Sequence, residues 1–423
     1  MAPPKVLIAG AGIGGPALAL WLARMGYDIT VVERNSALRA TGQQIDLRGQ
    51  GIVIMRLMGI EDAVRAALCH EPGMRVIDHR GKTQAFFPVN TSGKGSQGAT
   101  SEFEIMRGDL VNILYDATKD LEGVKYIFDC HIEDFTQDQG SPGGKVHVTF
   151  SDGRQDDYDL LVGADGVGSA TRRIMLGPSF PDPRHDLHGH FAFFTAPTRE
   201  GDSKDWTVCL VPGGKMVMTR KDKPENIRVY FIKFGNCEAL DKAKTLAEQK
   251  AAVVEMFQGT EGAQVDRFIQ DLKESPLTDD LYSAHMHQVR LPEGFWSRGR
   301  VVLLGDAAYY PMGGVGTTAA LIGAYVFAGE LSKQLKQNGQ PLETSDIEGA
   351  AKEYERTVRP FIQSQLKTPD FPIPRSRFGI RILHIAVWLF SVLRIDKLLF
   401  AWTRPEEQHK LEYPDYFGLQ DGR

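Results

Sequence analysis

Three glycines near the N-terminus, Gly10, Gly12 and Gly15, have the G-x-G-x-x-G spacing that suits binding of a dinucleotide pyrophosphate. Gly10 permits a tight turn, Gly12 lets the backbone approach a phosphate, and Gly15 lets a helix pack closely on a strand. Glu33 follows about 20 residues later, where a carboxylate can accept hydrogen bonds from a ribose diol. We therefore expect a dinucleotide here. The alternative is a glycine turn that binds no ligand.

Two further glycine loops carry an aspartate directly after an apolar run. The first is Gly163-Ala-Asp165-Gly166, and the second is Gly305-Asp306 after residues 300–304. Ligands of open α/β sheets bind at the carboxyl ends of the strands, so both aspartates are candidates for the same site. The alternative is that each aspartate is an ordinary cap at the end of a strand.

The elements that must position these loops can be read around them. Residues 5–9 and 28–33 are apolar and β-branched, and residues 13–23 have helical periodicity, as in a βαβ unit. Residues 6–23 carry no charge over about 18 positions, which on hydropathy alone could pass for a membrane helix or a signal segment. The glycine spacing, the strand that follows at once and the lack of a basic stretch beyond Lys5 indicate no targeting segment.

Alternating strands begin near residue 183 and indicate an antiparallel sheet. The strands are expected at 188–194, 206–211, 215–219 and 227–232. Helices are expected at 241–257 and 264–272, after which the strand at 300–304 and the helix at 317–337 resume the βα pattern. The simplest fold is a Rossmann-type α/β sheet that is interrupted by an antiparallel insertion and completed by a late strand.

The remaining elements are less sharply marked. We expect helices at 52–58, 61–69 and 350–367, a further helix starting near Asp109, a hairpin at 73–89, a loop at 90–101, and strands at 126–129, 145–150 and 155–162. The tail at 378–402 is strongly apolar, but its longest uncharged piece, 382–393, is shorter than the roughly 20 residues of a membrane span. We expect tail helices that pack across the body of the protein, with membrane or partner contact as the alternative.

Composition excludes several classes of protein. The chain has 423 residues, 42% of them hydrophobic and 24% charged, which is ordinary for a globular protein with more than one core. A net charge of -5 without a run of Lys or Arg does not suggest nucleic acid or an anionic membrane. The cysteines lack metal-binding spacing and fit reduced thiols of a cytoplasmic protein: Cys69, Cys130, Cys209 and Cys237.

The three glycine-containing motifs, in this order and with an antiparallel segment between the last two, resemble the class A flavoprotein monooxygenases, the para-hydroxybenzoate-hydroxylase-like family that uses FAD. The resemblance covers roughly residues 4–335. Within it, residues 42–49, 106–110 and 323–331 are most similar to the branch that includes tetracycline-inactivating monooxygenases. That branch also acts on polycyclic aromatic and quinone-like substrates.

The resemblance implies a division into domains. An FAD-binding domain would comprise residues 1–72, 102–182 and 286–370, and a substrate domain would comprise residues 73–101 and 183–285. Residues 371–423 would form a C-terminal helical segment.

The resemblance also implies roles for individual residues. Glu33 would hold the adenosine ribose, Arg107 the phosphates or the ribitol, and Asp306 the ribitol. Asp165 would lie near both FAD and the nicotinamide cofactor, and Arg48 beside the flavin ring. The residues expected at the cofactor are Gly10, Gly12, Gly14, Gly15, Glu33, Arg34, Arg48, Arg107, Asp165, Asp306, Gly316 and Thr317.

By the same resemblance, NADPH or NADH transiently reduces the FAD, and O2 adds to form a flavin C4a-hydroperoxide. This species would hydroxylate or epoxidise an aromatic or polycyclic small molecule in secondary metabolism or detoxification. Arg48, Pro311 and Tyr230 are the expected catalytic residues, and no metal is expected. His190, His285 and His287 are candidates, beside Tyr230, for the base that deprotonates a phenol, and the alternative for each is a structural role.

The loop at 309–316, which in the family faces the flavin, is shorter than usual, and Thr317-Thr318 stand where the family commonly has an amide side chain. Two other classes of function therefore stay open. One is a flavin oxidase, dehydrogenase or reductase that transfers no oxygen. The other is a flavin- or nucleotide-binding protein without enzyme activity.

Overall fold

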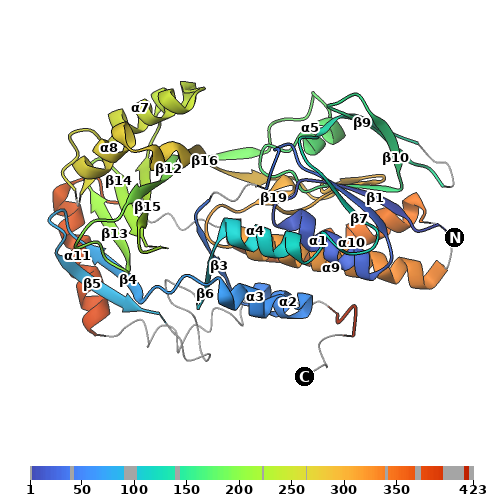
Figure 1. Ribbon diagram of the computed structural model, residues 1–423, viewed down its shortest axis with the longest axis horizontal. Coiled ribbons are helices and arrows are strands. Elements are labelled where there is room, and N and C mark those ends of the chain that lie inside the picture. The colour runs from blue at the N-terminus through green and yellow to red at the C-terminus, as the bar shows by residue number, and fades with distance from the viewer. Residues whose placement is uncertain are drawn as a thin grey trace.

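The computed structural model describes residues 2–38, 42–89, 102–138, 143–221, 223–262, 264–338, 342–366, 373–393 and 414–418. These residues form two lobes side by side (Figure 1). One lobe contains the glycine turn and a largely parallel sheet. The other contains a large, mostly antiparallel sheet with helices on its outer face. The predicted loop at 90–101 lies outside the described residues.

The first lobe is built on a six-stranded sheet in the order β17-β18-β11-β1-β2-β7. Its strands are β1 (Lys5–Ala9), β2 (Asp28–Val32), β7 (Val124–Ile127), β11 (Leu160–Gly163), β17 (Ser297–Arg298) and β18 (Val301–Leu303). Only β17 runs antiparallel to its neighbour. β18 pairs with β11, so the late strand that the sequence predicted does complete this sheet.

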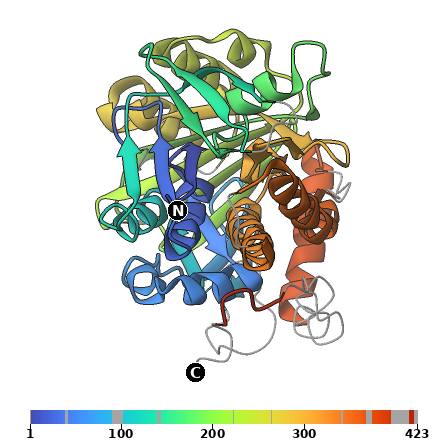
Figure 2. The ribbon, with the colours of Figure 1, turned by 90° about the vertical axis from the view of Figure 1, so that its right-hand side faces the viewer.

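The helices of this lobe pack on the sheet or on one another. They are α1 (Gly14–Arg24), α2 (Gln50–Met58), α3 (Glu61–Ala66), α4 (Arg107–Asp116), α5 (Ala170–Leu176), α9 (Gly316–Asn338) and α10 (Thr344–Leu366). Helix α2 lies against α9, and α3 lies against α4. α1 packs against α9, and Figure 2 views these helices end-on below the sheet. Trp21 of α1 and Leu321 of α9 are fully buried. Residues 6–23 are therefore apolar because they form a buried strand and a buried helix.

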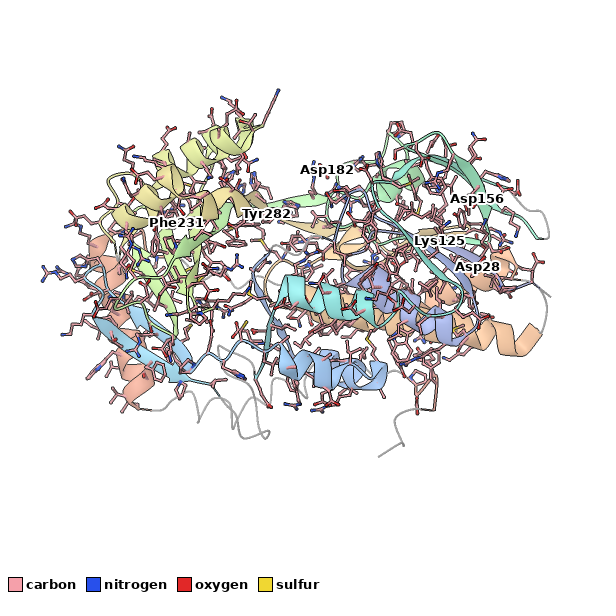
Figure 3. The ribbon with its side chains drawn as sticks, viewed as in Figure 1. Asp28, Lys125, Asp156, Asp182, Phe231 and Tyr282 are labelled. Atoms are coloured by element: carbon pink, nitrogen blue, oxygen red, sulfur yellow. The ribbon has the colours of Figure 1, made fainter. Side chains whose placement is uncertain are left out.

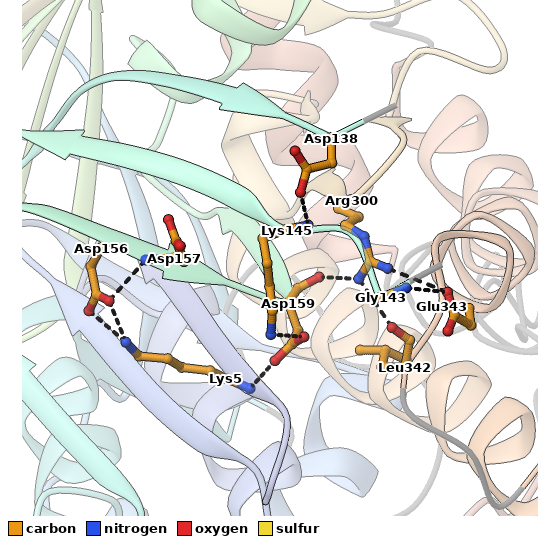
Figure 4. A network of polar contacts seen from close by, with 10 residues as sticks. All are labelled: Lys5, Asp138, Gly143, Lys145, Asp156, Asp157, Asp159, Arg300, Leu342 and Glu343. Atoms are coloured by element: carbon orange, nitrogen blue, oxygen red, sulfur yellow. Dashed lines mark hydrogen bonds and ion pairs between the residues drawn. The ribbon is translucent and has the colours of Figure 1, made fainter. Parts of the chain in front are cut away.

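The predicted strand at 155–162 is in fact two strands, so this prediction was wrong. β10 (Gln155–Tyr158) joins β9 (Val146–Phe150) and β8 (Ile132–Gln137) in a separate antiparallel sheet, whereas β11 belongs to the parallel sheet. Asp159 lies between them, and its side chain accepts hydrogen bonds from the Lys5 backbone N–H at 2.8 Å and from Lys145 Nζ at 2.5 Å (Figure 4). These bonds fix the point at which the chain changes sheets.

Other boundaries also differ from the predictions. The helix predicted at 241–257 is divided into α6 (Glu238–Lys242) and α7 (Leu246–Phe257), because Thr245 and Glu248 form a capping box that starts a new helix. Helix α3 ends at Ala66, and Leu68 then pairs with Ile105. The strands β3 (Gln44–Leu47), β6 (Phe103–Met106) and β8 were not predicted. The short helices η1 (Pro276–Asp280) and η2 (Gly305–Ala307) were also not predicted.

The second lobe contains an eight-stranded sheet in the order β19-β16-β12-β15-β14-β13-β4-β5. Its strands are β4 (Gly73–Ile77), β5 (Thr83–Pro88), β12 (Arg184–Pro197), β13 (Trp206–Val211), β14 (Lys215–Arg220), β15 (Asn226–Phe234), β16 (Tyr282–Arg290) and β19 (Tyr309–Tyr310). The hairpin and the four strands predicted from alternation are present. β16 was not predicted, and it crosses the expected domain boundary at residue 286.

Helices α7 and α8 (Val265–Glu274) pack on one face of this sheet and bury Phe194 and Phe231. Phe191 and Phe193 alternate with Phe194 along β12 and therefore lie on the opposite face, toward the first lobe. The sheet thus has a sealed outer face and an inner face that is available to line a site.

The two described parts of the C-terminal tail pack against different lobes. α11 (Arg377–Val392) lies along the β4–β5 hairpin, where Ser391 Oγ donates a hydrogen bond to the Phe86 carbonyl at 3.2 Å. Its other face is apolar and exposed, with Phe378 73% and Trp388 50% accessible. Residues 414–418 return to the first lobe, where Phe417 stacks on Trp21 with ring centroids 4.9 Å apart. Within the described chain, no helix combines the length and apolarity that crossing a bilayer requires.

We expect Tyr416→Ala to destabilise the protein, because Tyr416 is buried against Gly329 and its hydroxyl donates to Glu330 at 2.5 Å. Truncating a buried aromatic side chain costs about 3–5 kcal/mol. Trp388→Ala, on the exposed face of α11, is the matched control and should change stability by no more than about 0.5 kcal/mol. Denaturant unfolding of the two variants measures the difference. Equal losses would contradict this account of the C-terminal contact.

Candidate active site

Three loops meet at one edge of the parallel sheet because β1, β11 and β18 are neighbours and end at the same side. The loops contain Gly10, Asp165 and Asp306 respectively. A cavity of about 740 Å³ opens there. Its lining includes the predicted cofactor residues Gly10, Gly12, Glu33, Arg34, Arg107, Asp165 and Asp306. Segments about 300 residues apart in the sequence are thus gathered at the position that this fold uses for ligands.

The glycine turn has the geometry that its sequence predicted. Gly10 has φ +108°, and a Cβ at this position would lie 2.5 Å from the Ala164 carbonyl oxygen. A Cβ at Gly15 would overlap the Gly10 carbonyl oxygen, so α1 can approach β1 only with glycine at this position. At Gly12 a Cβ would point into the cavity, 3.6 Å from Arg107 Nη2. The backbone therefore lies open to a phosphate group between α1 and Arg107.

Glu33 lies at the end of β2 on the rim of the same cavity. Its Oε2 accepts a hydrogen bond from the Ala11 N–H at 3.1 Å, and its Oε1 accepts from Asn35 Nδ2 at 2.6 Å. The carboxylate is therefore fixed against the glycine turn. This is the position from which an acidic group can bind a ribose diol.

Asp165 has a clear structural task. Its Oδ1 accepts from Ser169 Oγ at 2.5 Å, and its Oδ2 accepts from the backbone N–H and the hydroxyl of Thr171, both at 3.0 Å. These bonds hold the start of α5, as the alternative of a strand-end cap anticipated. Asp165 also lines the cavity, so it would lie next to a ligand bound there.

Asp306 lies in η2, directly after β18. Burial raises the pKa of this carboxyl to about 6, although the positive charge of Arg107 acts in the opposite direction. The start of α9 lies against it, since a Cβ at Gly316 would be 3.7 Å from Asp306 Oδ1. A half-buried carboxylate that faces a cavity suits a ligand that supplies hydroxyl donors, such as a polyol chain.

A second cavity of about 650 Å³ lies between the start of α9 and the inner face of the eight-stranded sheet. It shares Gly12, Arg107 and Asp306 with the first cavity, so the two adjoin. The predicted residues Gly14, Arg48, Tyr230, Gly316 and Thr317 line it as well. An extended dinucleotide could therefore occupy the first cavity and present its far end to the second.

The wall of the second cavity is aromatic and sulfur-rich. It includes Phe191, Phe193, Met218, Ile232 and Met286. Phe191 and Phe193 stack with centroids 4.6 Å apart, and Tyr282, labelled in Figure 3, lies beside Phe191 at 5.8 Å. Such a wall favours a flat, largely apolar ligand.

The sequence analysis missed one polar cluster in this wall. Arg220, at the end of β14, donates to the buried Glu104, and its Nε lies 3.6 Å from Oε1 of the buried Glu71. Its guanidinium lies 4.3 Å from the Trp206 ring centroid. Alternation along β14 could have identified Arg220, because Met216, Met218 and Arg220 share one face. Its partners could not be identified, since Glu104 lies 116 residues away in the sequence.

Glu71 is unusual in this cluster because burial, assisted by the nearby negative charge of Asp46, raises its pKa to about 7 against the pull of Arg220. The cluster holds two carboxyl groups for one guanidinium. Gln44 lines the cavity beside it, and within the described part of the chain neither end of its side-chain amide has a hydrogen-bond partner. This part of the wall is therefore prepared for a polar group of a ligand.

Glu71→Gln should stabilise the protein selectively at high pH. A carboxyl whose pKa rises from 4.5 to about 7 on folding contributes stability below pH 4.5 that is lost as the pH rises through 7. The neutral amide of Glu71→Gln does not titrate, so this variant does not lose that stability at high pH. The loss in the wild type is at most about 3 kcal/mol of unfolding free energy. Denaturant unfolding at pH 5 and pH 8.5 measures it. A Glu71→Gln curve parallel to that of the wild type would rule out the raised pKa.

Of the three expected catalytic residues, Arg48 and Tyr230 line the second cavity and Pro311 does not. Arg48 lies in the wall of the second cavity and pairs with Asp46 at 2.8 Å. Tyr230 is buried in the same wall, where desolvation raises its pKa to about 12, so its hydroxyl is a donor at neutral pH. Pro311 does not line either cavity, whereas its neighbours Tyr310 and Met312 do. The Pro311 carbonyl accepts a hydrogen bond from Gln288 Nε2 at 2.7 Å.

The three histidines weighed as bases, His190, His285 and His287, line neither cavity. His190 and His285 lie on the face of the sheet opposite to Phe191. His287 packs against Tyr310, and burial lowers its pKa.

Comparison with known proteins agrees with this geometry. Residues 4–353 match the family model described as FAD binding domain. The chain is 56% identical over 422 residues to the flavin-dependent monooxygenase eupH of Phoma sp, with 98% of each chain covered. It is 37% identical to the FAD-dependent monooxygenase asL4 of Sarocladium schorii, over 97% of this chain and 98% of that one. The tetracycline destructase Tet(51) superposes with a TM-score of 0.73 at 28% identity, over 98% of this chain and 100% of that one.

The fold is that of an FAD-binding oxidoreductase. The chain belongs to the class A flavin-dependent monooxygenase family, which confirms the resemblance seen in the sequence.

Proposed function

We propose that this enzyme uses NADPH or NADH and O2 to hydroxylate or epoxidise an aromatic or polycyclic small molecule, in secondary metabolism or detoxification. The observation that carries the proposal is the pair of adjoining cavities. The first fits the elongated dinucleotide, and the second offers a flat apolar space that ends in a polar group. The tetracycline destructase shares the fold, and its name states tetracycline, a polycyclic compound, as its substrate.

The residues of the first cavity fit FAD. The backbone from Gly12 to Gly15 would bind the pyrophosphate, Glu33 the adenosine ribose, and Asp306 the ribitol. Arg34 and Arg107 would balance the phosphate charge. When bound, FAD would supply the redox chemistry that transfers one oxygen atom of O2 to the substrate. Asp165 would contribute mainly by holding its loop next to the cofactor and the incoming nicotinamide.

The chain's own task at the reacting end is charge stabilisation and exclusion of water. The N-terminus of α9, at Gly316 and Thr317, directs backbone N–H groups toward the boundary of the two cavities, where they would stabilise negative charge. Arg48 would add positive charge in the same wall. Pro311 would act as a positioning residue through Tyr310 and Met312.

The polar part of the substrate would face Arg220, Gln44 and Tyr230. With its pKa near 12, Tyr230 would donate a hydrogen bond to a substrate oxygen and would not serve as the base. The aromatic body would pack on Phe191 and Phe193. In this proposal the eight-stranded sheet with its helices is the substrate domain, and the parallel sheet with its helices is the FAD-binding domain.

A flavin oxidase or dehydrogenase on the same fold is the alternative, because the loop at 309–316 is short. Purified protein loaded with FAD is mixed with NADPH or NADH and with two polycyclic probes, tetracycline and alizarin. We expect at least one probe to accelerate NAD(P)H oxidation with a matching uptake of O2 and little free hydrogen peroxide. Quantitative release of peroxide with every probe that binds would favour the oxidase.

A further inference from the structure

A cluster of histidine and aspartate side chains lies on the outer face of the eight-stranded sheet, away from both cavities. His190 of β12 and His285 of β16 face each other directly across the two strands, with ring centroids 4.5 Å apart. Asp241 of α6 reaches over both rings. One ligand atom from each of the three side chains lies within 4.8 Å of the others. The proposed monooxygenase reaction uses none of these groups.

The donor atoms converge on one point. Asp241 Oδ1 lies 2.8 Å from His190 Nε2 and 3.3 Å from His285 Nδ1. Ligand atoms of a tetrahedral zinc site, with bonds of about 2.0–2.2 Å, are separated by roughly 3.3–3.6 Å. The two separations from Asp241 are close to this range, and the two ring nitrogens lie within 4.8 Å of each other, so side-chain adjustment alone can bring the three atoms around a divalent ion.

The outward nitrogens of the two rings are held as in known metal sites. His190 Nδ1 lies 3.4 Å from the Gly235 carbonyl oxygen, and His285 Nε2 lies 2.7 Å from Asp186 Oδ1. A ring N–H that donates to a carbonyl or a carboxylate leaves the other nitrogen as a lone-pair donor. Without an ion, His190 Nε2–H donates to Asp241 Oδ1 at 2.8 Å, and a bound ion would take the place of this proton between the two groups.

Exposure is graded across the cluster. The His190 side chain is 1% exposed, whereas His285 is 35% and Asp241 is 40% exposed. A hydrated ion can thus enter from the Asp241 side, and water can take a fourth position there. The buried ring lies at the bottom of the site, which distinguishes this cluster from scattered surface groups.

We infer that His190, His285 and Asp241 form a binding site for a divalent transition-metal ion of the zinc type, with Asp186 orienting His285. Two histidines and one carboxylate are a ligand set that zinc accepts. The bound ion would link α6 to strands β12 and β16 and so stabilise the outer face of the sheet. The site lies on the opposite face of β12 from Phe191 and is therefore separate from the oxygen-transfer site.

The test uses the full-length, FAD-loaded protein after treatment with a chelator. Titration calorimetry with ZnCl2 should give one ion per chain, with proton release that scales with the ionisation enthalpy of the buffer. CoCl2 should add absorption bands at wavelengths longer than those of the flavin. The melting temperature should rise with zinc. A protein that binds no ion, or binds several weakly without a change in melting temperature, would overturn the inference.

Variants identify the ligands. His285→Gln and Asp241→Asn should each weaken zinc binding by at least about 100-fold, and Asp186→Asn by about 10–100-fold. His147→Gln is the matched control, because His147 also contacts two carboxylates, Asp157 at 2.7 Å and Asp138 at 3.0 Å, without a second histidine. Its binding should equal that of the wild type. Equal losses in the control, or unchanged binding in His285→Gln with full FAD content, would contradict the assignment.

Discussion

Asp306→Ala is expected to give a protein that purifies without the yellow colour of a flavin. The carboxylate is half-buried at the junction of the two cavities, beside Arg107 and the start of α9. Loss of a hydrogen bond that involves a charged group weakens binding by about 1.5–3 kcal/mol, which is roughly 10–150-fold in FAD affinity. The variant also removes the electrostatic attraction between Asp306 and Arg107, which lowers FAD affinity further if this attraction positions Arg107 at the cofactor.

The measurement is the dissociation constant of FAD for the apoprotein, followed by flavin fluorescence, with Asp306→Asn beside it. The amide of Asp306→Asn keeps one hydrogen-bond acceptor, so the FAD affinity of this variant should lie between those of the wild type and of Asp306→Ala. Asp116→Ala is the control, because Asp116 is an exposed residue of α4 whose carboxylate pairs with Lys119, away from both cavities. Full FAD occupancy of Asp306→Ala, at the affinity of the wild type, would disprove the assignment of Asp306 to the ribitol.

Arg220→Met is expected to be the most destabilising change in the second lobe. Arg220 is the cation next to the buried Glu71 and Glu104, and it also covers the Trp206 ring. Removing one partner of a buried ion pair costs about 3–5 kcal/mol, because the remaining charge stays desolvated. The variant should unfold at lower denaturant concentration, and the loss should be smaller at pH 5, where Glu71 is protonated.

Two further variants separate charge from packing. Glu104→Gln in the Arg220→Met background should recover part of the stability, since it removes one uncompensated charge. Arg184→Met is the control, because Arg184 pairs with Asp182 on an exposed surface, where ion pairs contribute about 0–1 kcal/mol. If Arg220→Met and Arg184→Met unfold at the same denaturant concentration, the buried cluster does not contribute to stability as described.

The sequence predicted well where local pattern decides structure. The spacing of Gly10, Gly12 and Gly15 predicted the turn, and alternation predicted the strands β12 to β15. The motifs at Asp165 and Asp306 could be assigned to one site because strand ends of a parallel sheet share an edge.

The sequence failed where partners are distant. Glu71, Glu104 and Arg220 are unremarkable residues in three separate segments, and only the pairing of β4 with β13 and the position of β6 bring them together. The break at Asp159 is likewise caused by Lys5 and Lys145, not by the local strand pattern. β16 was missed because its polar residues, among them His285, His287 and Gln288, obscure the alternation.

The most direct test of the proposed function is the fate of molecular oxygen. The FAD-loaded protein is supplied with NADPH or NADH and with tetracycline or alizarin under ¹⁸O2, and the products are analysed by mass spectrometry. We predict one ¹⁸O atom in the organic product for each nicotinamide that is oxidised. Complete recovery of the label as hydrogen peroxide, with a bound but unaltered probe, would contradict oxygen transfer and leave an oxidase on this fold.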